Sequence, residues 1–185
     1  VLILTRYFIL LLDFNFSFSQ STLMINNEKS TISYNAKHVL HAWDGVNDNI
    51  SGVIIYDNEI SKIAIAAKVV DFDSGNSGRD SHSLEVLEAL KFPNIKFYSD
   101  EITTQGNAIT FNGDIEFHGQ KKSLKVLGTV DDNENLINVT GKFQIIPTEF
   151  SIKLPSFMLI EMEDYLNISF DIQFDNCLLY TSPSP

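Results

Sequence analysis

Residues 74–82 place reactive side chains beside flexible residues in one short segment, which reads SGNSGRDSH. The segment does not fit a phosphate-binding loop, because the Walker pattern needs Gly-Lys-Ser or Gly-Lys-Thr at the start of a helix. His82 with Asp80 and Ser81 has the residue types of a hydrolase or isomerase site. However, sequence neighbours rarely converge on one substrate atom, and the chain lacks the Gly-x-Ser-x-Gly elbow.

The same segment can instead be a structural corner between a strand and a helix. Its two glycines would supply backbone freedom, and Asp80 or Ser81 would cap the helix by accepting a backbone N–H. In a further interpretation, Arg79 and His82 lie at the mouth of a barrel and hold the polar head of an apolar ligand. A guanidinium suits an anionic head because it donates two charge-assisted hydrogen bonds. The strands and the helix predicted around this segment are needed to choose between these interpretations.

Alternating apolar and polar residues dominate the chain after residue 20, a pattern typical of strands with one buried face. Strands are predicted at 31–35, 52–56, 62–72, 95–98, 109–117, 124–130, 137–145 and 168–174. Glycines 113, 128 and 141 interrupt the apolar phase, which is typical of a sheet that bends towards closure or is closely approached. The predicted fold class is all-β, mainly antiparallel, with about eight strands in a closed barrel.

One short amphipathic helix is predicted at about residues 83–90. Leu84, Leu87 and Leu90 recur every three residues there, and Pro93 ends the pattern.

The first 19 residues have the order of a secretory signal peptide. Arg6 precedes a short apolar run at 7–12, and a small-x-small cleavage site ends at Ser19. Because Asp13 ends this run well short of the roughly 20 apolar residues that span a bilayer, no integral membrane segment is expected in the mature chain. The alternative is a buried first strand. The predicted division is a signal peptide at 1–19, one barrel domain at 20–174, and a disordered or non-native tail at 175–185.

The charged and metal-binding residues limit the possible partners. With a formal net charge of −11, the chain is not expected to bind nucleic acid, because lysine and arginine supply most phosphate contacts. The single cysteine, Cys177, excludes an intrachain disulfide and a cysteine-based metal site. The histidines, His38, His41, His82 and His118, are scattered, so no metal site is predicted, and His118 is expected to face solvent.

The segment 69–102 resembles the central signature of the YceI-like proteins. In that family a loop with Arg-Asp-x-His leads into a short helix and then into a Phe-Pro or Tyr-Pro step before a strand. Arg79, Asp80 and His82 match the loop, and Phe92 and Pro93 match the step. The stretch GDIEFHGQKKSLKVLGTV resembles the next hairpin of the family, and the resemblance covers about residues 30–174. The stretch HVLHAWDGVNDNISG departs from the commoner form, in which a histidine precedes a Gly-x-Phe strand.

The resemblance implies a lipocalin-like barrel that is periplasmic or secreted in bacteria and is not an enzyme. Such a protein would carry or sequester a long-chain amphiphile, such as a polyisoprenoid, an isoprenoid quinone or a fatty-acid derivative. The expected partner is therefore a hydrophobic small molecule, no cofactor other than such a lipid is expected, and a homodimer is left open.

Six apolar residues are candidates for the lining of the barrel lumen: Phe72, Phe97, Phe111, Ile115, Phe117 and Phe143. They could equally fill a core, because a lumen and a packed interior need the same side chains.

Three hypotheses follow from the sequence. The chain is a lipid carrier with Arg79, Asp80 and His82 at the head group or at a structural corner, a hydrolase or isomerase that uses His82 and Asp80, or a filled-core structural protein of the envelope or stress response.

Overall fold

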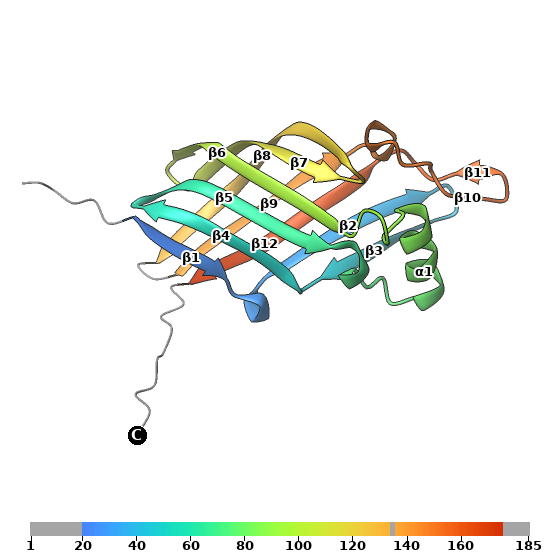
Figure 1. Ribbon diagram of the computed structural model, residues 1–185, viewed down its shortest axis with the longest axis horizontal. Coiled ribbons are helices and arrows are strands. Elements are labelled where there is room, and N and C mark those ends of the chain that lie inside the picture. Colours follow the sequence, from blue (N-terminus) through green and yellow to red (C-terminus); the bar gives the residue numbers. More distant parts are fainter. Residues whose placement is uncertain (1–19, 134–135, 176–185) are drawn as a thin grey trace, which may run out of the picture.

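The computed structural model describes residues 20–133 and 136–175. The predicted signal peptide at 1–19 and residues 176–185 of the predicted tail lie outside the described residues, whereas Asp175, the first residue of that predicted tail, ends β12. Twelve strands, one α-helix and three short 3-10 helices form this part of the chain (Figure 1). The strands are β1 (Ser21–Ile25), β2 (Thr31–His38), β3 (His41–Asn47), β4 (Ile50–Asp57), β5 (Glu59–Lys68), β6 (Asn94–Gln105), β7 (Ala108–Phe117), β8 (Gln120–Asn133), β9 (Leu136–Ile145), β10 (Ser156–Phe157), β11 (Ile160–Glu161) and β12 (Leu166–Asp175). The helices are η1 (Asn27–Lys29), η2 (Val69–Asp71), α1 (Ser77–Val86) and η3 (Pro147–Phe150).

Eight of the strands close into an antiparallel barrel. Their order is β1-β4-β5-β6-β7-β8-β9-β12, and β12 pairs back to β1 through Met24 with Asp175 and Ile25 with Phe174. The predicted all-β, eight-stranded lipocalin-like barrel is therefore confirmed. Gly113 shows how the sheet bends: it lies on β7 opposite a register shift in β6, and a Cβ atom there would be 2.3 Å from the Tyr98 carbonyl oxygen. The predicted close approach at this glycine is thus observed.

One edge of β12 pairs with two strands in succession. Its last two residues pair with β1, whereas residues 166–171 pair with β2. At the change of partner, the backbone of Gln173 accepts a hydrogen bond from the Asn26 N–H at 2.9 Å and donates one to Ser30 Oγ at 3.0 Å. β2 then pairs with β3, so the β2–β3 hairpin extends the sheet beyond the closed ring at one end of the barrel (Figure 1).

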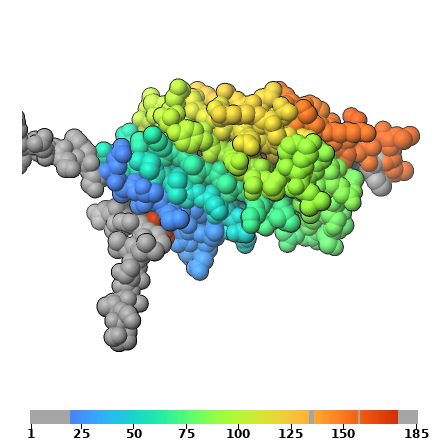
Figure 2. Space-filling model, viewed as in Figure 1, coloured from blue at the N-terminus to red at the C-terminus, as the bar shows by residue number. Residues whose placement is uncertain are grey.

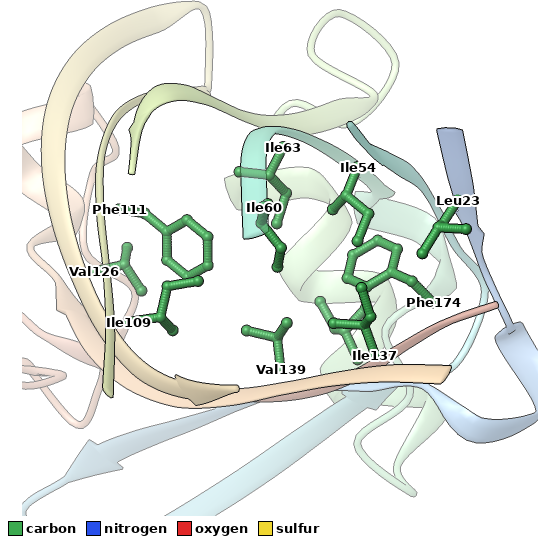
Figure 3. Close-up of a cluster of buried hydrophobic side chains, with 11 residues drawn as sticks. Leu23, Ile54, Ile60, Ile63, Ile109, Phe111, Val126, Ile137, Val139 and Phe174 are labelled. Carbon is green, nitrogen blue, oxygen red and sulfur yellow. The ribbon is translucent and has the colours of Figure 1, made fainter. Parts of the chain in front are cut away.

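The barrel interior contains two groups of buried apolar side chains. The first group fills the end near β1, where residues from β1, β4, β5, β7, β8, β9 and β12 point inward towards one another (Figure 3). Its members are Leu23, Ile54, Ile60, Ile63, Ile109, Phe111, Val126, Ile137, Val139, Ile172 and Phe174. The second group lies on the side of η3 and consists of Ile115, Phe117, Ile145, Phe150, Ile152 and Ile168.

The α-helix is present but begins earlier than the predicted range of 83–90. It spans Ser77–Val86, and residues 87–91 form turns. Its N-cap is Asn76, whose side chain accepts the Arg79 N–H at 3.0 Å, so the prediction that Asp80 or Ser81 caps the helix is wrong. The first turn carries no apolar residue, and for this reason the leucine spacing could not reveal the true start.

Candidate functional site

An apolar cavity of about 150 Å³ lies at the end of the barrel where the β2–β3 hairpin leaves the ring. Three parts of the chain enclose it: this hairpin, the segment from η2 through α1, and the stretch from η3 to β12. The lining residues are Tyr34, Ala36, Trp43, Val69, Val70, Phe72, Asp80, His82, Ser83, Leu84, Val86, Leu87, Ile95, Phe117, Ile145, Pro147, Ile152, Leu154, Pro155, Met162, Leu166 and Ile168. Almost all of them are apolar, so the cavity suits a hydrophobic ligand.

Tyr34 forms one wall of the cavity because the facing strand has a glycine. Tyr34 of β2 pairs with Gly45 of β3, and a Cβ atom at Gly45 would lie only 2.3 Å from Tyr34 Cε1. The tyrosine ring therefore occupies the space that a side chain at position 45 would need, and it contacts Phe72 with ring centroids 5.8 Å apart. Burial raises the pKa of the Tyr34 phenol, a hydrogen bond from the Trp43 side chain acts in the opposite direction, and the nearby Asp80 carboxylate raises the pKa again.

A cationic and aromatic pair lies beside this wall. The guanidinium carbon of Arg79 lies 5.5 Å from the centre of the Trp43 ring, a cation–π geometry. Trp43 also contacts His41, with ring centroids 5.4 Å apart. Arg79 thus connects the first turn of α1 to β3 at the edge of the cavity.

Asp80 and His82 both line the cavity but do not form an acid–base pair. The Asp80 carboxylate accepts hydrogen bonds from the backbone N–H and the hydroxyl of Ser74, at 3.2 and 2.6 Å. The His82 side chain is 60% exposed, and its Nδ1 lies 3.8 Å from Glu85. Residues two apart on a helix do not face one another. Asp80 therefore holds the loop before α1 against the helix, and the cavity reaches solvent beside His82.

The six apolar candidates divide between the two ends of the barrel. Phe72 and Phe117 line the cavity. Phe111 is only 1% exposed and belongs to the filled end, while Ile115 belongs to the buried group on the η3 side. Phe97 and Phe143 are partly buried and pack against both groups. The structure thus brings two of the six to the cavity wall and places the other four in the surrounding core.

His118 is buried, so the expectation that it faces solvent is wrong. It occupies the first position of a two-residue turn between β7 and β8 with φ of 50°, followed by Gly119 with φ of 71°. This is a type I′ turn, which directs the side chain away from the alternation of the strand. His118 Nδ1 donates to the Phe150 carbonyl at 3.0 Å, because a carbonyl can only accept. Its Nε2 lies 3.2 Å from the Glu88 carboxylate, at an angle that makes no hydrogen bond.

His118 therefore contacts two of the segments that enclose the cavity: Glu88 follows α1, and Phe150 ends η3. The ring also packs on Phe92, with centroids 4.6 Å apart. None of the residues of α1 is fully buried, so contacts such as these hold the helix in place.

Tyr34 and Trp43 were not predicted as site residues from the sequence. The signal that could have found them is the unusual stretch HVLHAWDGVNDNISG, which contains Trp43 and whose Gly45 pairs with Tyr34 in the β2–β3 hairpin. In residues 20–133 and 136–175, no group of three or more histidine, cysteine, aspartate or glutamate side chains could hold a metal ion. None of the described helices has the length and hydropathy of a membrane-spanning segment.

A closed eight-stranded barrel with an apolar cavity at one end defines a lipocalin-like class of protein. Residues 23–174 match the YceI-like domain, and the chain belongs to the YceI-like family. Protein YceI of Salmonella newport is 24% identical over 136 residues, which cover 68% of this chain and 69% of the relative.

Two solved structures with this fold are similar to the chain. Burkholderia cenocepacia BcnA aligns with a TM-score of 0.73 at 19% identity, covering 80% of this chain and 98% of BcnA. A polyisoprenoid binding domain from Saccharophagus degradans, implicated in plant cell wall breakdown, aligns with a TM-score of 0.68 at 10% identity. That alignment covers 85% of this chain and 99% of the domain.

Proposed function

We propose that the chain binds one long-chain amphiphile, of the polyisoprenoid class, with the apolar part in this cavity, and that it carries or sequesters this lipid. The observation that carries the proposal is the wall of the cavity, which is almost entirely apolar at the end of a barrel whose other end is filled. The name of the Saccharophagus degradans domain supports the choice of ligand class.

The size of the cavity sets how such a ligand would bind. A dry apolar cavity of about 150 Å³ accepts a benzene-sized molecule, whereas drug-sized ligands use about 300–1,000 Å³. The cavity therefore holds one or two isoprene units as it stands, and a longer chain requires α1 to move outward. The helix suits such a movement, because none of its residues is fully buried.

Arg79, Tyr34 and Trp43 are the groups that would meet the polar head. The guanidinium can donate two hydrogen bonds to an anionic head, and the tyrosine hydroxyl can donate one. His82 lies at the exposed edge of the same cavity and would contact the head group from the solvent side.

A binding function is favoured over catalysis by the geometry of the two residues that a hydrolase or isomerase would use. The Asp80 carboxylate accepts a hydrogen bond from Ser74, and the His82 side chain is exposed with its nearest carboxylate, that of Glu85, 3.8 Å away. The cavity also weighs against a protein with a wholly filled core. The signal-like order of residues 1–19 supports a periplasmic or secreted location.

Ligand titration followed by the fluorescence of Trp43 tests the proposal, because this cavity residue is the sole tryptophan of the chain. A polyprenol or an isoprenoid quinone should change its emission saturably at one site per chain. Ser83→Phe should abolish binding, since it puts a benzene-sized ring into a cavity of that size. Ser81→Phe is the matched control, because Ser81 is exposed on the same helix. Equal binding by both variants, or no binding by the unaltered chain, would refute the proposal.

A further inference from the structure

Two hairpin tips at the cavity end of the molecule expose large apolar side chains. Val39 and Leu40 form the tip of the β2–β3 hairpin and are 66% and 61% exposed. Met158 and Leu159 form the tip of the β10–β11 hairpin and are 73% and 99% exposed, and Ile160 beside them is 46% exposed. The β10–β11 hairpin projects from the end of the molecule in the space-filling view (Figure 2). We call these five residues the tip patch.

The two hairpins are joined side by side, so the tip patch is one surface. The backbone N–H of Glu163 donates to the Lys37 carbonyl at 2.8 Å, and the two side chains form an ion pair at 2.9 Å. Nearer the tips, the His38 ring is hydrogen-bonded to the Ile160 carbonyl at 3.1 Å. The ring nitrogen must donate here, because a carbonyl oxygen only accepts.

The backbone at the second tip is conformationally costly. Met158 and Leu159 have φ of 52° and 66°, the left-handed region. A two-residue turn of this kind strongly prefers Asn-Gly or Asp-Gly, which adopt positive φ easily. Bulky residues in this region are uncommon and are found where their side chains serve a function. The turn thus presents two apolar side chains to solvent where a polar turn would be more stable.

The tip patch lies next to the cavity along both hairpins. Ala36 and Trp43 line the cavity and pair with each other three residues from the first tip. Pro155 and Met162 line it and flank the second hairpin. Since a strand rises about 3.3 Å per residue, the tips extend roughly 10 Å beyond the cavity wall. This matches the roughly 5–10 Å to which interfacial segments enter a bilayer.

We propose that the tip patch inserts into the interfacial region of a zwitterionic lipid bilayer and so places the cavity against the membrane. The choice of a bilayer rests on the proposed lipid cargo, because such a ligand must leave and enter a membrane. The charge of the chain selects the kind of bilayer. The net charge is −11, and in residues 153–164 Glu161, Glu163 and Asp164 outnumber Lys153, so anionic lipids would repel this end.

Flotation of the purified chain with phosphatidylcholine vesicles tests this surface without any cargo. The unaltered chain should float with the vesicles, and less of it should float with phosphatidylglycerol vesicles at low salt. Met158→Glu/Leu159→Glu should lower the partition coefficient about tenfold or more, because two charges must then enter the interface. The charge-matched control is Met24→Glu/Leu127→Glu, since both residues are exposed apolar residues away from the tips, and it should float like the unaltered chain.

Several results separate the docking surface from the proposed cargo. Flotation that depends on Met158 and Leu159 supports the surface even if no polyprenol alters Trp43 fluorescence. Unchanged flotation of the tip variant overturns the proposal that the tip patch inserts into a bilayer. The cargo proposal is then tested by the Ser83→Phe titration alone. The unaltered chain could fail to float and instead form a dimer in light scattering that Met158→Glu/Leu159→Glu converts to a monomer. This result also overturns insertion into a bilayer and assigns the tip patch to contact with a second copy of the chain. Stronger flotation with phosphatidylglycerol overturns the choice of lipid.

Discussion

Gly45→Ala should destabilise the fold through one identifiable contact. The new Cβ would lie 2.3, 2.6 and 2.7 Å from Cε1, Cζ and Oη of Tyr34, whereas non-bonded carbons prefer about 3.5–4.0 Å. The ring would have to move by about 1 Å or more, and Phe72 and Trp43 oppose the movement. Overpacking of this kind costs about 1–3 kcal/mol, and alanine regains about 0.5–1 kcal/mol of backbone entropy in a strand. The expected net loss is about 1–2 kcal/mol of unfolding free energy.

A double-mutant cycle with Tyr34→Ala isolates this contact. Urea unfolding followed by circular dichroism would be measured for the unaltered chain, both single variants and the double variant. Because Tyr34→Ala removes the atoms that clash, Gly45→Ala should be neutral or stabilising in that background, with a coupling energy of about 1–3 kcal/mol. Equal destabilisation in both backgrounds would refute the explanation. In the single variant the displaced ring should also lower the affinity for a polyprenol, read from Trp43 fluorescence.

Three further predictions test the two ends of the barrel and its titrating groups. Phe111→Ala should cost about 3–5 kcal/mol in urea unfolding without changing polyprenol affinity, whereas Phe117→Ala should also enlarge the cavity and change that affinity. The hydrogen bond from Tyr56 to Asp132, at 2.5 Å, raises the pKa of Tyr56 to about 12. The stabilisation of the fold by this hydrogen bond should therefore be complete below the ordinary tyrosine pKa of about 10 and be lost as the pH rises through about 12. Asp132→Ala should lower the pKa of Tyr56 in a tyrosinate absorbance titration. His118→Ala should cost about 1–3 kcal/mol in thermal or urea unfolding because the buried Phe150 carbonyl loses its donor, and His118→Asn should cost less because asparagine tolerates positive φ.

The strands could be predicted from the sequence because a two-residue alternation records directly which face of a strand is buried. The strand predicted at 109–117 is β7, Ala108–Phe117. The helix could be predicted only where apolar residues point into the cavity, at Leu84 and at Leu87 just after its last turn. Its first turn, from Ser77 to Asp80, is polar and exposed or half-buried, so it has the composition of a loop. The alternation also failed at His118, because it ends where the strand ends and the turn begins.

The candidate site was predicted less completely because alternation gives the face of a strand but not the position along the barrel axis. Phe111 and Phe117 lie on the same strand, six residues and about 20 Å apart. Phe111 is in the filled end and Phe117 lines the cavity. Which end is filled depends on where β12 exchanges β1 for β2, a pairing between residues more than 100 positions apart. No local pattern records that pairing.

The exchange of partners along β12 also explains how a binding cavity and a stable fold coexist in this chain. A barrel of eight strands is just wide enough for its own side chains to fill it or to hold one small ligand. At the end where β1 closes the ring, side chains fill the interior, with Ile54 and Phe174 fully buried. At the other end β2 continues along the β12 edge and diverges with β3, and Tyr34 and Trp43 of this hairpin become one wall of the cavity. Substitutions at the cavity end, such as Ser83→Phe, should therefore change ligand binding at a much smaller cost in stability than substitutions such as Phe111→Ala at the filled end.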